Sequence, residues 1–134
     1  MATASSTPVV LLVEDSAEQR LLLREFLADI LTADFCEAAD ADTGYAHVRA
    51  RTPDLVLLDL HVPPHGGLAL LHALRADPAL RHVQVIVLSG SRRPEDLAVI
   101  AAAAPCRFIE KPYDLDVLEA AILECLQVGA EQPR

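Results

Sequence analysis

Short apolar runs alternate along the chain with segments whose apolar residues recur every three or four positions. Continuous apolar runs of four to eight residues are typical of strands buried on both faces of a sheet, and the longer period indicates amphipathic helices. Five runs therefore predict strands, at residues 9–13, 35–39, 55–58, 83–88 and 107–110.

Helices are predicted after each of these strands. They lie at about residues 16–31, 42–50 and 95–103, and two more begin near residues 67 and 114. Ser16 and Gln19 have the spacing of a capping box, and Asp114 is a good N-cap residue. The positions expected to face the core share a helical spacing. They are Leu23, Phe26, Leu27 and Ile30 in the first helix, Gly67, Leu70, Leu71 and Leu74 in the third, and Leu115, Leu118, Ile122 and Cys125 in the last.

Five strands alternating with five helices predict an α/β domain with a parallel sheet covered on both faces. Right-handed crossovers leave few topologies, of which we expect the flavodoxin-like, doubly wound order 2-1-3-4-5. We assign this domain to residues 8–127, with flexible tails at 1–7 and 128–134. In that order ligands bind at the carboxyl ends of the first and third strands.

Composition narrows the possible partners. The 134-residue chain has a formal net charge of −9, which argues against nucleic acid or anionic membrane as the main ligand. Its three cysteines are widely spaced and odd in number, so a reducing cytoplasm is the simpler context. The apolar run at 9–13 is far too short for a signal peptide or a membrane span.

Chemically reactive side chains follow the strands at their carboxyl ends. Glu14 and Asp15 follow the first strand, Asp59 ends the third, Ser89 follows the fourth and Lys111 the fifth. Taken singly, each has an ordinary interpretation as a helix cap or a turn residue. Together, three acids, a hydroxyl and a cation at one edge of the sheet indicate a site for a hard cation and a phosphoryl group.

The lysine carries an argument of its own. The chain has 11 lysine and arginine residues, and Lys111 is the only lysine among them. A chain that otherwise uses arginine for positive charge keeps a compact ammonium group at this one position. Pro112 restricts the backbone of Lys111 and makes a cis bond between them possible.

Four segments, "VEDS", "LLDLHVPPHGG", "LSGS" and "FIEKPY", occur in this order on the predicted fold. In this combination the chain resembles the receiver domain of a two-component response regulator, from about residue 9 to residue 126. The resemblance implies that Asp59 is phosphorylated by transfer from a phosphohistidine on a sensor histidine kinase or phosphotransfer protein. It also implies that the chain is a signalling switch rather than an enzyme with a separate substrate.

The resemblance further implies a bound Mg²⁺. Its protein ligands would be Asp15, Asp59, the backbone carbonyl of His61, and Glu14 through a water molecule. Mg²⁺ prefers six oxygen ligands and keeps several waters, which agrees with such a set.

Three other residues have implied roles in the same family. Lys111 would neutralise charge on the transferred phosphoryl oxygens, and the Ser89 hydroxyl would hydrogen-bond the phosphoryl group once it is formed. Phe108 matches the aromatic residue that swings between exposed and buried states, although before the match it reads equally well as an ordinary core aromatic.

Several positions depart from the common pattern of the family. Ser89 replaces the commoner threonine, and Gly90 replaces the usual alanine. Val62 and Gly66 stand where a methionine and an acidic residue are usual. None of these changes removes a chemical group from the expected site.

Three alternatives remain open. A phosphatase of the haloacid-dehalogenase type would need a second acid two residues beyond the nucleophile, where this chain has His61. A pseudo-receiver that never carries phosphate is disfavoured by the intact acids and Lys111. The chain could also be a receiver that belongs to a larger hybrid kinase or regulator.

The output is expected to pass to a separate effector protein or to a second copy of the chain. In receivers the switch residues move the face built by the fourth helix, fifth strand and fifth helix. We expect that face to combine arginines with apolar groups, because such residues are enriched at interface hot spots. The candidates are Arg92, Arg93, Leu97, Arg107 and Tyr113.

Overall fold

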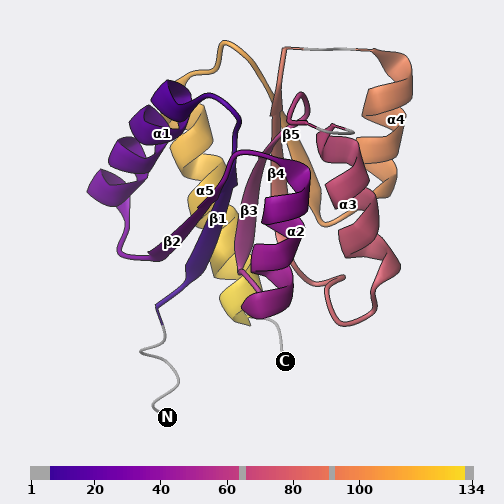
Figure 1. Ribbon diagram of the computed structural model, residues 1–134. Helices are drawn as coiled ribbons and strands as arrows, with labels where there is room; N and C mark the ends of the chain where they lie inside the picture. The colour runs from indigo at the N-terminus through magenta and orange to yellow at the C-terminus, as the bar shows by residue number, and fades with distance from the viewer. Residues whose placement is uncertain (1–6, 64–65, 91–92, 132–134) are drawn as a thin grey trace.

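A single parallel sheet of five strands organises the molecule (Figure 1). The computed structural model describes residues 7–63, 66–90 and 93–131. The strands are β1 (Val9–Val13), β2 (Asp34–Ala38), β3 (Leu55–Asp59), β4 (Gln84–Ser89) and β5 (Cys106–Glu110). They lie in the order β2-β1-β3-β4-β5, which confirms the predicted flavodoxin-like topology.

Helices cover both faces of the sheet, as Figure 1 shows. One face carries α1 (Ala17–Ile30) and α5 (Leu115–Glu131), and the other carries α2 (Ala41–Ala50), α3 (Gly67–Ala76) and α4 (Pro94–Ala102). Because the central strands are buried on both sides, β1 and β3 are apolar along nearly their whole length, as the sequence indicated.

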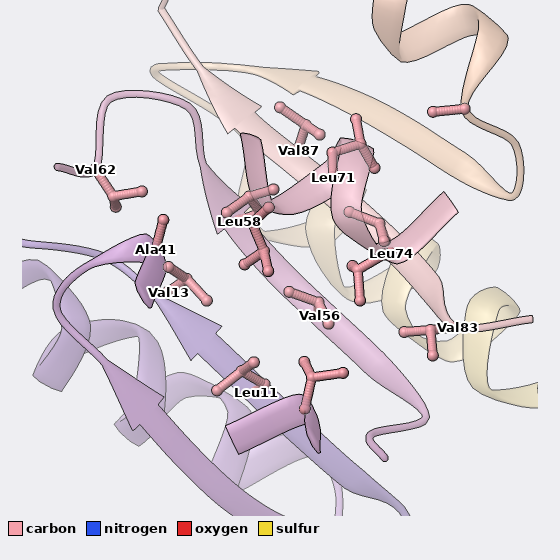
Figure 2. Packing of buried hydrophobic residues seen from close by; sticks show 14 of the residues in the cluster. Leu11, Val13, Ala41, Val56, Leu58, Val62, Leu71, Leu74, Val83 and Val87 are labelled. Carbon is pink, nitrogen blue, oxygen red and sulfur yellow. The ribbon is translucent and has the colours of Figure 1, made fainter. Parts of the chain in front are cut away.

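The two faces have separate hydrophobic clusters. Figure 2 shows the cluster beneath α2, α3 and α4, where Val56 and Leu58 of β3 pack with Leu71 and Leu74 of α3. The cluster beneath α1 and α5 contains Leu23 and Leu27 together with Leu118, Ile122 and Cys125.

Most predicted helix faces are confirmed, with one exception. The α1 stripe is buried or partly buried, and all four predicted α3 positions are buried. Leu115, which we expected to face the core, is instead 50% exposed. It is the first residue of α5, which begins beyond the end of β5 at Glu110, at the carboxyl edge of the sheet.

Element boundaries differ from the predicted ones by small amounts. Ser89 belongs to β4 itself, because its carbonyl accepts from the Lys111 N–H at 2.9 Å and it pairs with Glu110 in the ladder. The helix α5 extends through Glu131, past the expected boundary at 127, since no proline stands between Pro112 and Pro133 to end it earlier. The parts of the expected tails at 1–6 and 132–134 lie outside the described residues.

Two predicted helix N-caps and one possible cis peptide bond are found in the structure. The Ser16 side chain accepts from the Gln19 N–H, and Asp114 accepts from the Asp116 N–H at 2.7 Å. The Lys111–Pro112 bond is cis. Among the described residues, no helix is both long enough and apolar enough to cross a membrane.

Candidate functional site

Three carboxylates meet at the carboxyl edge of the sheet. One oxygen from each of Glu14, Asp15 and Asp59 lies within 4.8 Å of the others. The sheet register explains this arrangement, because Val13 of β1 pairs with Leu58 of β3, so the residues that follow them emerge side by side. Glu14 and Asp59 are each only 6% exposed, whereas Asp15 is open to solvent.

Lys111 reaches into this acidic cluster from the end of β5. Its Nζ donates to Oδ2 of Asp59 at 3.2 Å, to Oε1 of Glu14 at 3.3 Å and to Oε1 of Gln19 at 3.4 Å. Partial burial acts to lower the pKa of Lys111, but the charges of Asp59 and Glu14 together hold that pKa above its ordinary value. The lysine is therefore a fixed positive charge beside the buried carboxylates.

The same environment acts on Glu14. Burial is the largest influence and raises the pKa of this carboxyl, and the charge of Asp59 raises it further. The Ser16 N–H, which donates to Oε2 of Glu14 at 3.1 Å, and Lys111 both act in the opposite direction. Two acids held this close repel each other, and a cation placed among them would relieve that repulsion.

Two hydrogen bonds orient the Asp59 carboxylate, and a close backbone contact fixes the end of its strand. The His61 N–H donates to Oδ1 of Asp59 at 2.9 Å, while Lys111 takes Oδ2. The start of α3 packs directly on this strand end, because a Cβ at Gly67 would lie 2.6 Å from the backbone oxygen of Asp59. Gly66 before it has a φ of +84°, which favours glycine over other residues.

Ser89 and Phe108 lie farther along the sheet. Ser89 is fully buried at the end of β4, next to β3, on the same edge as Asp59. Phe108 of β5 is partly buried and packs against the cluster beneath α2, α3 and α4. The structure thus brings Glu14, Asp15, Asp59 and Lys111 together, with Ser89 one strand away.

An apolar groove opens beside Lys111. It has a volume of about 760 Å³ and lies between α1 and the segment that joins β5 to α5. Its lining residues are Glu18, Gln19, Leu22, Leu23, Phe26, Lys111, Pro112, Tyr113 and Leu115. Leu22 is 61% exposed, and together with Leu115 it gives the groove an accessible apolar surface.

The groove corrects one sequence expectation. Tyr113, which we placed on the face of α4, β5 and α5, packs instead against the cluster of α1 and α5. Arg93 at the N-cap of α4, Leu97 of α4 and Arg107 of β5 are exposed or partly exposed, in agreement with the expectation. Arg92 lies outside the described residues.

Two contacts near the site have no counterpart in the sequence analysis. Gln19 was predicted as a capping residue, yet its side chain also accepts from Lys111. Arg20 donates from Nη1 to the backbone oxygen of Glu14 at 2.6 Å. Neither contact leaves a sequence signal, because one depends on rotamer choice and the other ends on a backbone carbonyl.

Comparison with known proteins agrees with this geometry. Residues 10–123 match the response regulator receiver domain, so the chain belongs to that family. It is 26% identical over 113 residues to the chemotaxis protein CheY of Pseudomonas aeruginosa, covering 84% of this chain and 91% of CheY.

A longer relative and a solved structure also match the chain. The gliding motility regulatory protein of Myxococcus xanthus is 33% identical over 122 residues, which cover 90% of this chain but 16% of that protein. The crystal structure of a signal receiver domain from a histidine kinase of Syntrophus aciditrophicus superimposes with a TM-score of 0.85 at 26% identity, covering 96% of each chain. Receiver domains thus occur both alone and within larger proteins.

Proposed function

We propose that this chain is a phosphoacceptor switch in which Asp59 takes a phosphoryl group from a phosphohistidine. One observation carries the proposal: the Asp59 carboxylate lies between two further acids and a lysine at the carboxyl edge of the sheet. An Asp59 oxygen attacks phosphorus, forming a P–O bond as the P–N bond to the imidazole breaks. The electron pair of that bond leaves with the imidazole nitrogen of the donor, and the acceptor becomes an acyl phosphate.

The donor atoms present fit Mg²⁺. Carboxylate oxygens are the ligands this ion prefers, and the cluster supplies three carboxylates within reach of one another. Glu14, Asp15 and Asp59 would hold it, with the backbone carbonyl of His61 as a further ligand. When bound, the ion supplies positive charge to the phosphoryl oxygens.

Residues of the chain supply the rest of the chemistry. Lys111 places its ammonium group beside Oδ2 of Asp59, where it can pair with a phosphoryl oxygen as charge develops. The Ser89 hydroxyl is proposed to bond the phosphoryl group, and Phe108 to respond by changing its burial. The cysteines are free thiols, which agrees with the reducing cytoplasm that we propose as the location.

The groove beside Lys111 is proposed to seat the phosphodonor protein. It runs directly from Lys111 along α1, so a partner bound there would bring its histidine to the Asp59 edge. Its exposed leucines provide apolar area of the kind that protein partners cover.

The effector, or a second copy, is proposed to bind the face of α4, β5 and α5. Arg93 is paired with Glu95 at 3.2 Å, and Arg107 with Glu124 at 2.6 Å. Exposed pairs of this kind contribute only about 0–1 kcal/mol each, so a partner could replace them at small cost.

Phosphorylation by a small donor tests the central proposal. Incubation with acetyl phosphate and Mg²⁺ is expected to add one phosphoryl group, seen by intact mass, and Asp59→Asn is expected to abolish it because Asp59 is the sole acceptor. Omission of Mg²⁺ is the matched control and should greatly reduce the added mass. Label that persists in Asp59→Asn would contradict the assignment.

A further inference from the structure

Arg20 joins the loop after β1 to the edge strand β2. From α1 its Nη1 donates to the Glu14 carbonyl at 2.6 Å, and its Nε donates to Oε1 of Glu37 at 3.1 Å. The side chain is only 19% exposed. Because the guanidinium is planar and its donors have fixed directions, these two bonds together hold the Glu14 carbonyl at a defined place.

The outer anchor of Arg20 is itself held in place. Glu37 also accepts from Nη1 of Arg24 at 2.6 Å, and the Arg24 guanidinium lies 4.8 Å from the centre of the Phe35 ring. The Glu14 N–H donates to the Ala38 carbonyl at 3.0 Å. Both peptide groups of Glu14 are thus tied to β2, one directly and one through Arg20.

The pinned carbonyl belongs to the peptide unit that leads into Asp15. The orientation of that plane sets the direction in which the Asp15 side chain leaves the backbone. Asp15 is exposed, and among the described residues no hydrogen bond to its carboxylate is found. Its place in the acidic cluster therefore depends on the backbone rather than on contacts of its own.

We propose that Arg20 is a positioning residue for the cation site, which holds the Glu14–Asp15 peptide unit so that both carboxylates face Asp59. This inference rests on the proposed cation binding at that cluster. The proposal also predicts the direction in which Arg20 changes the affinity for Mg²⁺. A positive charge near a cation site opposes metal binding, so an Arg20 that acted through charge alone would weaken the affinity, whereas a positioning Arg20 strengthens it.

Arg20→Lys separates these possibilities, because it keeps the charge and loses the two-directional fork. We expect the Mg²⁺ dissociation constant, measured by calorimetric titration of the unphosphorylated protein, to rise about tenfold. The stabilisation of melting by Mg²⁺ is expected to shrink in parallel. Glu37→Ala, which removes the outer anchor, is expected to weaken Mg²⁺ binding in the same direction by a smaller factor.

Arg24→Gln is the matched control. It breaks the other ion pair to Glu37 but leaves the bond between Arg20 and the Glu14 carbonyl. We expect it to lower the melting temperature and to change the Mg²⁺ dissociation constant by less than removal of Glu37 does, because Arg20 keeps its own bond to Glu37. Unchanged or tighter binding in Arg20→Lys, or equal weakening in Arg24→Gln, would overturn the positioning role. Wild-type protein that bound no Mg²⁺ would instead overturn the proposed cation site itself.

Discussion

Asp59 is held by neighbours that act on different parts of the residue. The His61 N–H and the Lys111 ammonium bind separate carboxylate oxygens, and Gly67 packs against the backbone carbonyl. The first two contacts orient the carboxylate that we propose as the nucleophile, and the third fixes the distance between β3 and α3. Gly67 therefore helps to set the geometry of the site, although it has no side chain.

Gly67→Ala tests this contact. The new Cβ would lie 2.6 Å from the Asp59 oxygen and 3.1 Å from side-chain carbons of Leu58, so the strand end or the helix must shift. We expect a loss of about 1–3 kcal/mol in the free energy of unfolding, measured with urea. The rate of phosphorylation by acetyl phosphate is expected to fall as well, because the displaced atoms belong to Asp59.

Gly90→Ala is the control for this substitution. A Cβ at Gly90 meets no atom of the described residues within 4 Å. We expect stability to stay level or to rise by up to about 1 kcal/mol through the reduced freedom of the unfolded chain. Similar losses in the two variants would show that the contact with Asp59 is not the cause.

At the scale of the elements, one arginine joins several of them at the edge opposite the site. Arg75 lies in the last turn of α3 and donates to four backbone carbonyls of the loops before β4 and β5. Burial lowers the pKa of Arg75, but a guanidinium remains charged throughout the ordinary pH range. The bonds satisfy carbonyls at Arg81, Val83, Ala103 and Pro105.

Arg75→Met is expected to lower the free energy of unfolding by about 2–4 kcal/mol, because several partly buried carbonyls lose their donor at once. Urea unfolding measures the loss. Phosphorylation of the folded fraction by acetyl phosphate should not change, since the acidic cluster lies at the other edge of the sheet.

Arg81→Met is the matched comparison, because Arg81 is exposed and, within the described part of the chain, donates one bond, from Nε to the Arg75 carbonyl at 3.1 Å. Its removal is expected to change stability by less than about 1 kcal/mol. If the two variants were equally destabilised, the four bonds that Arg75 donates would not be the reason for the effect.

At the scale of the whole molecule, two surfaces are proposed to bind partners, and the acidic cluster lies at the carboxyl edge of the sheet. The groove on the α1 side begins at Lys111, and the arginines of α4 and β5 lie on another part of the surface. Under the proposed function, a donor and an effector would bind at different places and still depend on the same aspartate. If the two surfaces bind different partners, a variant in one surface should change donor labelling and a variant in the other should change effector binding.

Leu22→Ser is expected to slow phosphorylation by a histidine kinase or phosphotransfer protein that labels the wild type, by about tenfold if Leu22 is a hot spot of the contact. Labelling by acetyl phosphate, which needs no docking, should be unchanged. The paired reversals Arg93→Glu and Arg107→Glu should leave both rates unchanged. They should abolish associations that appear with the phosphoryl mimic beryllofluoride, followed by size exclusion and pull-down.

Each variant serves as the control for the other. If Leu22→Ser slowed labelling by acetyl phosphate as strongly as labelling by the protein donor, the groove would belong to the chemistry and not to docking. If the charge reversals left every beryllofluoride-dependent association intact, the output face would lie elsewhere.

The sequence by itself determined the topology and the membership of the acidic site. Buried parallel strands require continuous apolar runs, and residues that follow such runs must emerge at one edge of the sheet. Glu14, Asp15, Asp59 and Lys111 could therefore be placed together without coordinates. Their identities carried the family resemblance as well.

Only the tertiary structure decided how those groups are held and which surface each neighbour serves. The bond from Arg20 to the Glu14 carbonyl and the packing of Gly67 on the Asp59 carbonyl both end on backbone oxygens, which every residue possesses and no pattern marks. Leu115 was misplaced because helical period fixes a direction around an axis but not where the neighbouring strand ends. Tyr113 was misplaced because it lies in the connection between β5 and α5, whose path the sequence pattern does not fix. Those outcomes depend on the relative positions of elements distant in sequence, which packing alone sets.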